Sequence, residues 1–457
     1  MTVVVNPATE QVVGIVEATS IEEADAAIAR AQAAAPSWRD VAPGDRARLL
    51  RRFAEAVDAD GEHLAQLEVA NSGHTIGNAR WEAGNVRDVL HYYAAAPERL
   101  FGRQIPVAGG VDVTFREPIG VVGVIVPWNF PLEITLNKLG PVLAMGNTCV
   151  LKPAPDTPWN ATRLARLIAE QTDIPAGVVN IVTSSDHLVG EVISTSPDVD
   201  LVAFTGSTAT GRRIMEAAAA TLKPVFLELG GKSVNLFLDD ADLEAALPSV
   251  VMSCMHGGQG CAIATRVLVP RSGYDASVEL IAAGFAGWSY GDPTDPSNLQ
   301  GPQVSQRQQE RVLDHIAKGQ AEGARIVTGG GVPAHLPKGY YVEPTLFADV
   351  DNAMTIAQEE IFGPVLVVIP YDDDDDAVRI ANDSSYGLSG QITGGDLARA
   401  KAVARRIRTG TLGINGGVWY GADAPFGGYK GSGIGRQCGI EGLEIFTETK
   451  TVGWPSR

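Results

Sequence analysis

The stretch DLVAFTGSTATGRRIMEAAAA, residues 200–220, places an apolar run, a glycine-containing turn and a helix-forming segment one after another. The run DLVAF predicts a strand that ends at Phe204, and GRRIMEAAAA predicts a helix. Gly206 and Gly211 relax the turn between them, and the free amides at the start of the helix could hold a pyrophosphate. By itself the turn is weak evidence for a nucleotide site, because its spacing differs from the usual G-x-G-x-x-G pattern.

The same alternation of strand and helix extends in both directions along the chain. Further strands are predicted at GVVGVIVP, NTCVLKP and GVVNIVT before this stretch, and at RVLVP, LVVIPY, GLSGQIT and TLGIN after Glu228. Helical segments separate them, which is typical of a parallel sheet covered on both faces. The sequence therefore predicts an α/β fold with two Rossmann-like, doubly wound domains.

Three other segments have clear local signals. The first hundred residues are predicted to be mostly helical, beginning at a capping box formed by Ser20 and Glu23. The segment 102–120 has a Gly109-Gly110 turn between alternating runs, which predicts a β-hairpin. The acidic run at 372–376 precedes AVRIANDSS and predicts a helix start, where negative charge is favourable; a metal site is the less favoured reading.

Composition excludes several classes of function. The 457 residues include 54 acidic and 36 basic side chains, and the net charge of −18 opposes binding to nucleic acid or an anionic membrane. No apolar run approaches the roughly 18 residues that a spanning helix needs, and the N-terminus lacks a secretory pattern. The four cysteines are scattered, without disulfide or zinc spacing. We therefore expect a cytoplasmic protein without a structural metal.

The segment MHGGQGCAIATR places Cys261 in a glycine-rich turn, and Glu228 lies upstream in ELGGK. A thiolate attacks carbonyl carbons when a nearby base or an electropositive turn activates it, so this pair indicates covalent catalysis by sulfur. Cys254 and His256 could suggest a second Cys-His pair. They fall in the apolar stretch SVVMSCMH, however, and core packing is the favoured interpretation.

Asn129 lies between Trp128 and Phe130 in IVPWNFP, at the end of a predicted strand. Its amide could donate to an oxygen that becomes negative during attack on a carbonyl, while the aromatic neighbours exclude water. A proline-bounded turn with packed aromatics is an equally good interpretation of this motif alone. Lys152 ends another predicted strand, where side chains face the ligand crevice of such sheets.

The motifs become specific as an ordered set: PWNFP, VLKP, FTGS, ELGGK, GQGCA, EEIFGP and PFGGYKGSG. In this order they resemble the aldehyde dehydrogenase superfamily, and the resemblance runs from NPATE at 6–10 to TKTVG at 449–453. It implies that Cys261 is the nucleophile, Glu228 the general base and Asn129 the oxyanion donor, together with the backbone amide of Cys261.

The resemblance also implies a set of cofactor and substrate contacts. Glu360 and Phe362 match positions that hold the nicotinamide ribose and ring, although the adjacent Glu359 competes for the ribose role. Phe130 and Phe426 are expected to border the substrate. The other positions matching cofactor contacts are Ile125, Trp128, Lys152, Gly206 and Ser207.

The implied reaction is oxidation of an aldehyde to a carboxylic acid with reduction of NAD(P), through a thiohemiacetal and a thioester on Cys261 that is hydrolysed with Glu228 as base. Two alternatives remain open. An acylating enzyme would pass the thioester to coenzyme A, and Glu228 argues against it. A binding or structural module without turnover would have no use for Cys261, Asn129 and Glu228.

Two positions depart from the family pattern. Relatives often have Glu three residues after the motif lysine, where it binds the adenosine ribose, but this chain has Pro155 followed by Asp156. NAD is the expected cofactor, and NADP is not excluded electrostatically. Gln437 stands where many relatives have a Glu with an auxiliary acid-base role, so that role is expected to be absent.

The resemblance also implies a domain organisation. We expect a dinucleotide-binding domain at 1–102 and 121–228, a catalytic domain at 229–430, and an oligomerisation element at 103–120 and 431–457. The hairpin would pair with the C-terminal strand, ETKTVGW, of another subunit in a homodimer or homotetramer. Candidate pocket positions besides the two phenylalanines are Glu133, Asn137, Trp419 and Tyr420, with a subunit contact or a helix surface as the alternative for the first two.

Overall fold

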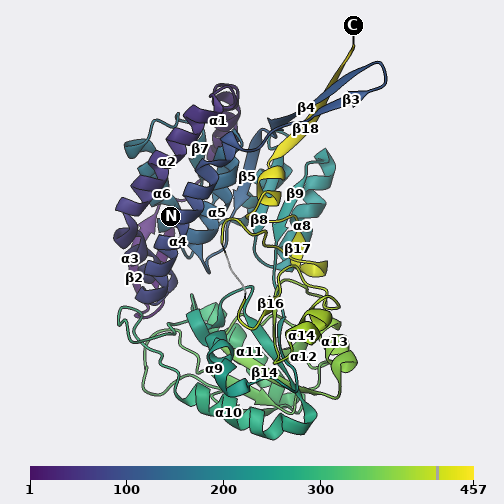
Figure 1. Cartoon of the computed structure of the whole chain (residues 1–457). Helices are drawn as coiled ribbons and strands as arrows, with labels where there is room; N and C mark the ends of the chain where they lie inside the picture. Colours follow the sequence, from purple (N-terminus) through teal and green to yellow (C-terminus); the bar gives the residue numbers. More distant parts are fainter. Residues whose placement is uncertain (418–420, 457) are drawn as a thin grey trace.

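The computed structural model describes residues 1–417 and 421–456 (Figure 1). The chain begins with a short antiparallel hairpin, which the sequence analysis did not predict. The mostly helical character predicted for the first hundred residues is confirmed by the four helices that follow, and so is the capping box of Ser20 and Glu23. The bounds of these first elements are β1 (Thr2–Asn6), β2 (Gln11–Val16), α1 (Ile21–Arg39), α2 (Pro43–Ala59), α3 (Gly61–Ser72) and α4 (Ile76–Ala94).

The first large sheet has the strand order β17-β9-β8-β5-β6-β7. Its strands are parallel except β17, which returns from the C-terminal region to pair antiparallel with β9. The strands are β5 (Val121–Ile125), β6 (Thr148–Lys152), β7 (Val179–Ile181), β8 (Leu201–Thr205), β9 (Val225–Glu228) and β17 (Gly433–Ile434). The connecting helices are α5 (Pro131–Ala144), α6 (Trp159–Gln171), α7 (His187–Thr195) and α8 (Thr208–Ala218).

The second large sheet has the order β12-β13-β14-β11-β10-β15-β16, and only β12 runs antiparallel to its neighbour. Its strands are β10 (Ser233–Phe237), β11 (Ala264–Pro270), β12 (Arg325–Thr328), β13 (Thr345–Ala348), β14 (Val365–Tyr371), β15 (Gly390–Thr393) and β16 (Gly413–Ile414). Its helices are α9 (Leu243–Val251), η3 (Met252–Gly258), α10 (Tyr274–Ala286), α11 (Gln306–Ala321), α12 (Thr355–Gln358), α13 (Asp374–Asn382) and α14 (Leu397–Ala404). Two doubly wound α/β units are therefore confirmed.

A third, small sheet forms an arm that projects from the body (Figure 1). Its strands are β3 (Gln104–Val107), β4 (Gly110–Pro118) and β18 (Thr447–Pro455), and the short helix α15 (Glu441–Glu444) precedes β18. The predicted hairpin is confirmed, with its turn at Gly109, where a φ of +78° suits glycine. The predicted pairing of this hairpin with the C-terminal strand of another subunit is corrected, because β18 pairs with β4 of the same chain along the whole strand.

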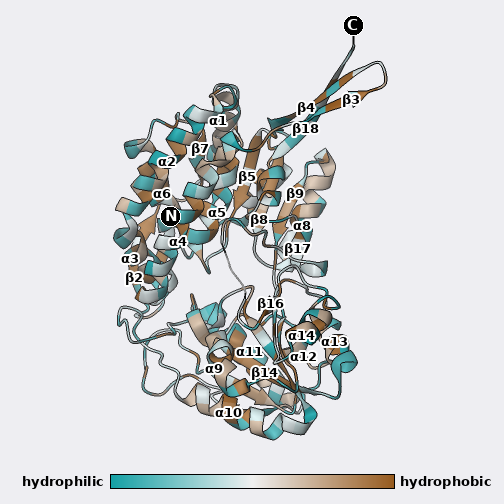
Figure 2. Ribbon diagram, viewed as in Figure 1, coloured by the Kyte–Doolittle hydropathy of each residue, from teal (hydrophilic) through white to brown (hydrophobic). Residues whose placement is uncertain are grey.

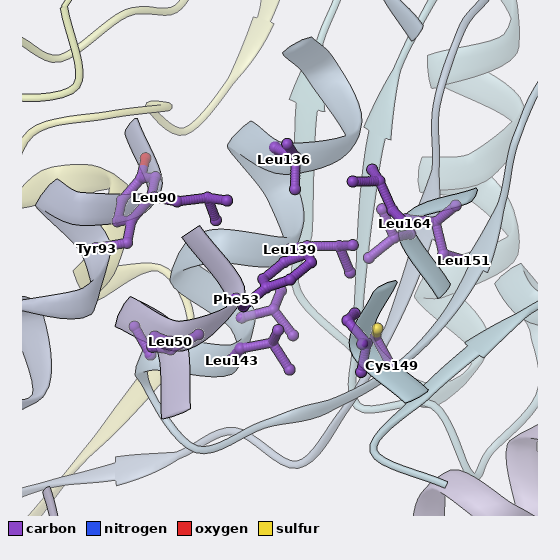
Figure 3. Close-up of a cluster of buried hydrophobic side chains, with 14 of the residues drawn as sticks. Leu50, Phe53, Leu90, Tyr93, Leu136, Leu139, Leu143, Cys149, Leu151 and Leu164 are labelled. Carbon is purple, nitrogen blue, oxygen red and sulfur yellow. The ribbon is translucent and has the colours of Figure 1, made fainter. Parts of the chain in front are cut away.

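The largest core packs α2, α4 and α5 against the first sheet (Figure 3). Leu139 and Leu143 of α5 lie at its centre beside Phe53 of α2, and all three side chains are completely buried. Burial of each contributes on the order of 2 kcal/mol. In Figure 2 hydrophobic colour gathers on the strands and the inner sides of the helices. This packing fixes α5, whose first turn directly follows the PWNFP motif.

The acidic run forms the start of α13, as predicted. Asp373 is its N-cap and accepts from the backbone N–H of Asp376. The neighbouring carboxylates pair with arginines of other elements, including Arg399 with Asp374 and Arg406 with Asp375. Their charge is thus balanced within the second unit. No helix within the described residues is long and apolar enough to cross a membrane.

Candidate active site

Chain segments from the two α/β units meet around one cleft of about 310 Å³. From the first unit come the loops that follow β5, β8 and β9, which is where the carboxyl ends of parallel strands present side chains to a ligand. From the second come the turn before β11, the start of α11 and the loop after α12. The lining comprises Pro127, Trp128, Asn129, Thr205, Gly206, Ser207, Glu228, Leu229, Gly230, Cys261, Arg307, Gln308, Arg311, Glu360 and Phe362.

Cys261 and Glu228 face each other in this cleft, as predicted. The Cys261 Sγ atom donates to Glu228 Oε2 across 3.9 Å. Burial and the negative charges of Glu228 and Glu360 raise the pKa of the Cys261 thiol well above its usual range. A reactive cysteine is activated by a nearby base or by an electropositive turn. The described residues supply the base, Glu228, but the side-chain charge around Cys261 is negative.

Lys138 is a functional candidate that sequence reasoning missed. It lies completely buried on α5, with its Nζ 3.6 Å from the centre of the Phe226 ring. Burial lowers the pKa of Lys138 and raises that of Glu228, and the charge of each offsets part of this effect on the other. The sequence does contain a signal for Lys138, because it lies inside the apolar run LNKLGPVLA. A lysine buried with such a run needs a partner.

Asn129 lies at the end of the β5 turn, immediately before α5. Its side chain is buried, and its Nδ2 donates to the backbone oxygen of Gln259 across 3.0 Å. A carboxamide carries two N–H groups, so one remains for an oxygen near Cys261. The structure therefore brings Cys261, Glu228 and Asn129 into one cleft.

The start of α8 forms another wall of the cleft. Ser207 is the N-cap and accepts from the backbone N–H of Thr210. Gly206 donates its backbone N–H to the backbone oxygen of Glu228. A Cβ at position 206 would lie 2.4 Å from the Phe204 ring. Close packing against this ring therefore favours glycine at position 206.

Glu360 and Phe362 line the cleft from the second unit. Glu360 accepts from the backbone N–H of Gly231 across 2.9 Å, and burial raises its pKa to about 7. Phe362 meets Trp128 edge to face, with ring centres 5.3 Å apart. Glu359 instead points outward, 62% exposed, and contacts His315. The geometry thus favours Glu360 over Glu359 for any contact inside the cleft.

Two predicted cofactor contacts, Ile125 and Lys152, lie outside this lining. They are register partners on β5 and β6, and Lys152 Nζ donates to the Ser184 backbone oxygen across 2.9 Å. Both residues end their strands at the carboxyl edge of the first sheet, the edge at which Gly206 follows β8. They extend the edge beyond the cleft towards α7.

The two phenylalanines predicted to border the substrate have contacts outside the cleft lining. The Phe130 ring lies 5.2 Å from the rings of both His74 and His256. Phe426 pairs with Gln437 through two backbone hydrogen bonds of 2.6 Å. Neither phenylalanine is part of the cleft lining described above. Trp419 and Tyr420 lie outside the described residues.

Glu133 and Asn137 face other parts of the first unit. Glu133 accepts from Asn85 of α4 across 3.1 Å, and Asn137 is buried beside Cys438. Neither is among the residues that line the cleft. The helix-surface interpretation is wrong for Asn137, because its side chain is buried between α5 and the C-terminal region.

The structure confirms the core-packing interpretation for Cys254 and corrects it in part for His256. Cys254 is buried among apolar side chains, as predicted. His256 is also buried, but it contacts the polar ring of His74 as well as the Phe130 ring. Its backbone departs from the predicted helix, with a φ of +52°. No local pattern reveals such a contact, because the two histidines are far apart in sequence.

Three further residues of the lining were missed. Arg307, Gln308 and Arg311 come from α11, a polar helix without any distinctive motif. Gln308 donates to the Phe362 backbone oxygen and Arg311 to that of Glu360, both across 2.8 Å. They hold the 359–364 loop against the cleft.

The cleft has features that fit a dinucleotide. The α8 N-terminus offers free backbone N–H groups for phosphate oxygens. Thr205 Oγ1 and Glu228 Oε1 are buried without a hydrogen-bond partner among the described residues. At Gly230 a Cβ would lie 2.3 Å from Glu360 Oε2, so the backbone there stays close to the carboxylate. The cleft thus offers backbone donors and unpartnered polar atoms to a polar ligand.

Comparisons with known proteins agree with this geometry. The model of the aldehyde dehydrogenase family matches residues 1–452. A geranial dehydrogenase of Castellaniella defragrans is 43% identical over 98% of this chain and 94% of its own length. A 3-succinoylsemialdehyde-pyridine dehydrogenase of a Pseudomonas species is 42% identical, again over 98% and 94%.

The solved structures include a close match to the whole fold. An aldehyde dehydrogenase of Mycobacterium tuberculosis, complexed with NAD+, has a TM-score of 0.96 and 42% identity, covering 99% of this chain and 94% of the other. Sequence motifs, sheet topology and these matches agree over nearly the full length. The chain therefore belongs to the aldehyde dehydrogenase family.

Proposed function

We propose that Cys261, Glu228 and Asn129 carry out the aldehyde oxidation that membership of this family entails. The observation that carries the proposal is the shared cleft, in which the Cys261 thiol lies 3.9 Å from the Glu228 carboxylate and Asn129 completes the wall. The products are a carboxylic acid and reduced NAD(P).

The first half-reaction forms a bond between sulfur and the aldehyde carbon. Glu228 accepts the thiol proton, Sγ attacks the carbonyl carbon, and the carbonyl electron pair moves to oxygen. The free N–H of Asn129 and the backbone N–H of Cys261 donate to this oxyanion. A bound nicotinamide cofactor would supply the acceptor for the hydride released from the aldehyde carbon. The oxygen then re-forms its double bond and leaves a thioester on Cys261.

The second half-reaction hydrolyses the thioester. Ionised Glu228 removes a proton from water, the resulting hydroxide adds to the acyl carbon, and the carbon–sulfur bond breaks to release the acid. Lys138 stabilises the ionised form of Glu228 through its charge. The same carboxylate therefore serves both steps and must return its proton to solvent between them.

NAD is proposed as the cofactor, held by Trp128, Ser207, Glu360 and Phe362 in the cleft and by Lys152 beside it. Support comes from the M. tuberculosis enzyme, whose structure contains NAD+. Pro155 supplies no carboxylate for the adenosine ribose, but Asp156 follows directly. Burial raises the pKa of Asp156, while the charge of Arg307 lowers it. We expect kcat/KM to be higher with NAD than with NADP.

The test is a measurement of reduced cofactor after mixing with an aldehyde. Geranial and 3-succinoylsemialdehyde-pyridine are suitable first probes, because relatives of similar identity are named for them. Rapid mixing separates the first burst of NADH from steady turnover. Cys261→Ala is expected to abolish both phases. Glu228→Gln is expected to slow the burst, because it removes the base that accepts the thiol proton, and to lose turnover.

Cys254→Ala is the matched control, because it removes a thiol that is buried away from the cleft. It should retain the burst. Turnover that requires coenzyme A would instead support an acylating enzyme. The absence of a burst with an aldehyde panel and both cofactors would support a module without catalysis. Loss of the burst in Cys254→Ala but not in Cys261→Ala would reject the assigned nucleophile.

A further inference from the structure

A cluster of four buried ionisable residues lies directly behind Asn129. Glu68 of α3, His74, Glu82 of α4 and His256 of η3 form it, and we refer to them as the histidine cluster. Each is at most 1% exposed. None lines the cleft, so the reaction described above does not use them directly. Burial of each charged or unpaired group costs free energy of folding, so the presence of four such groups together indicates that they have a role.

His74 is the centre of the cluster. Its Nε2 lies 2.6 Å from the backbone oxygen of Asn129 and 2.6 Å from His256 Nε2. Its Nδ1 lies 2.5 Å from Glu82 Oε1 and 3.7 Å from Glu68 Oε1. The imidazole therefore bridges a carboxyl group on one side and the peptide of the oxyanion donor on the other.

The contacts determine which atoms carry protons. A carbonyl oxygen has no hydrogen, so His74 Nε2 must carry the proton that it shares with Asn129 O. Burial lowers the pKa of His256 well below its usual range, and a hydrogen bond to the Asn129 backbone offsets part of this effect, so both imidazoles face the Asn129 peptide. Glu82 Oε1 and His74 Nδ1 lie 2.5 Å apart without hydrogen-bond geometry, and two unprotonated atoms would repel each other at this separation, so the pair carries a second proton. The Glu82–His74 pair thus holds two protons and is neutral overall, whichever atom carries the second.

Burial supports this neutral arrangement. It raises the pKa of the Glu82 carboxyl well above its usual range and lowers the pKa of His74. A metal ion fits the contact less well. The nearest ligand atoms of Glu68, His74 and Glu82 lie within 4.8 Å of one another. Two atoms that bind one zinc ion stand about 3 Å apart or more, since each bond is about 2 Å long, and the Glu82–His74 contact is shorter.

The cluster closes a ring of hydrogen bonds around Asn129. His256 accepts through its backbone oxygen from the Gln259 N–H across 3.2 Å, and Gln259 accepts through its own oxygen from Asn129 Nδ2 across 3.0 Å. His74 then joins His256 to the Asn129 backbone. The ring therefore fixes both the peptide and the carboxamide of the residue that donates to the oxyanion.

Backbone conformation shows that this ring holds an unfavourable arrangement. His256 has a φ of +52°, which non-glycine residues rarely adopt. Gly257 and Gly258 follow it with φ of +62° and +70°. The two glycines tolerate these angles, but His256 needs the contact with His74 to offset its strain. The loop that leads to Cys261 is thus attached to Asn129 through the two histidines.

We propose that His74 and His256 form a positioning pair that orients the Asn129 carboxamide towards the oxygen of the thiohemiacetal, with Glu82 fixing the proton on His74 Nε2. The proposal rests on the function proposed above, because it assigns a role to groups behind its oxyanion donor. Preorganised donors stabilise developing charge best when they need not reorient during the reaction.

The test compares His74→Met with His74→Gln. Methionine fills a similar volume without a donor, whereas glutamine keeps an N–H within reach of Asn129 O. The NADH burst should slow about tenfold in His74→Met, less than the about 100-fold expected from losing the Asn129 donor itself. His74→Gln should recover most of the rate. Thr135→Val, a buried isosteric change on α5, is the control and should keep the burst.

A double-mutant cycle separates positioning from general damage. If His74 acts through Asn129, adding His74→Met to Asn129→Ala should slow the burst no further. A structural role would instead make the two losses multiply. Alkylation of Cys261 by iodoacetamide forms no oxyanion, so its rate should be unchanged in His74→Met. Equal burst rates in His74→Met and the unaltered enzyme, or multiplied losses, would overturn the proposal.

Glu82 provides a second route if His74→Met fails to fold. Glu82→Gln can still donate to Nδ1 and should keep the burst, whereas Glu82→Leu frees the His74 tautomer and should slow it. Equal rates in these two variants would contradict the proposal. So would a stoichiometric metal in the purified protein, measured by mass spectrometry, whose removal slows the burst. A missing burst in the unaltered enzyme would reject the proposed function instead.

Discussion

Asn129 illustrates how much one side chain contributes when its partners are fixed. One N–H of its Nδ2 already donates to the backbone oxygen of Gln259. Because this bond fixes the plane of the carboxamide, it also fixes the direction of the second N–H. Removing a single oxyanion donor costs on the order of 3 kcal/mol. We expect Asn129→Ala to slow the NADH burst about 100-fold, with little change in NAD affinity measured by fluorescence titration. A burst as fast as that of the unaltered enzyme would show that Asn129 does not contact the oxyanion.

Lys138 should control the pH dependence of thioester hydrolysis. Glu228 works as a base only when ionised, so hydrolysis rises as pH passes upward through its pKa. Burial raises this pKa, and the Lys138 charge lowers it. In Lys138→Met the carboxylate loses that stabilisation, so the midpoint should move to higher pH. Steady-state turnover between pH 6 and 10, under conditions where hydrolysis limits the rate, measures it.

Lys223 supplies the control for this experiment. It is another largely buried lysine of the first unit, but it donates to the Ser196 backbone oxygen and faces Asp200, not Glu228. Lys223→Met should leave the pH midpoint where it is. A downward shift in Lys138→Met would mean that the lysine does not act on Glu228 through its charge.

Residues differ in how far the sequence reveals them. The positions of Cys261, Glu228 and Asn129 in one cleft were predictable, because each lies in a short motif whose order along the chain resembles a family. Lys138 and His74 were not, since their significance arises from contacts with Glu228 and Asn129 across long sequence separations. Lys138 and His74 are buried, and a buried polar group needs a hydrogen-bonding or charged partner.

Among the elements, α13 and α14 are held together by charge. Arg399 of α14 makes paired hydrogen bonds to Asp374 of α13 and also contacts Asp239 after β10. Its side chain is 33% exposed, so solvent weakens the pair, and we expect a loss of about 1 kcal/mol in Arg399→Met. The thermal unfolding midpoint should fall by about 2 °C.

Arg271→Met is the matched comparison at this surface. Arg271 contacts Asp372, but its side chain is 60% exposed, and among the described residues this is its one ion pair. Its removal should lower the midpoint by less than that of Arg399. If both variants unfold at the same temperature, the link between α13 and α14 does not depend on Arg399.

Element prediction succeeded where the pattern was long or buried. Strands β5, β6, β8 and β11 were found because their apolar runs are buried on both faces. The β1–β2 hairpin was missed because β2 is largely exposed and its residues show no clear alternation. The η3 segment was read as helix, but the ring through His256 and Gln259 bends its backbone. Tertiary contacts overrode local preference there.

At the scale of the whole molecule, the division into functional domains stays a prediction. The two large sheets agree with two α/β units. The proposed boundary at 430 to 431 is followed by β17, which joins the first sheet beside Glu228, and then by β18 in the arm. The C-terminal segment thus links the active-site sheet to the arm. Cytoplasmic residence also stays a prediction; all four cysteines are free.

Assembly is the property for which the arm provides the strongest argument. The β3–β4–β18 sheet projects from the body and exposes apolar side chains, including Phe115 at 46% and Trp454 at 50% (Figures 1 and 2). Large exposed apolar groups on a strand surface favour association. We expect a homodimer or homotetramer in which this sheet contacts another copy.

Phe115→Asp combined with Trp454→Asp should shift the protein to the monomer, measured by light scattering at micromolar concentration. Two charges would have to be buried at the interface, and this cost exceeds what the rest of the arm can offset. Exposed Val13→Asp on the β1–β2 hairpin is the control, because it adds charge away from the arm. A double variant that keeps the mass of the unaltered protein would place the interface elsewhere. The NADH burst of the monomer then decides whether the cleft is complete in one chain.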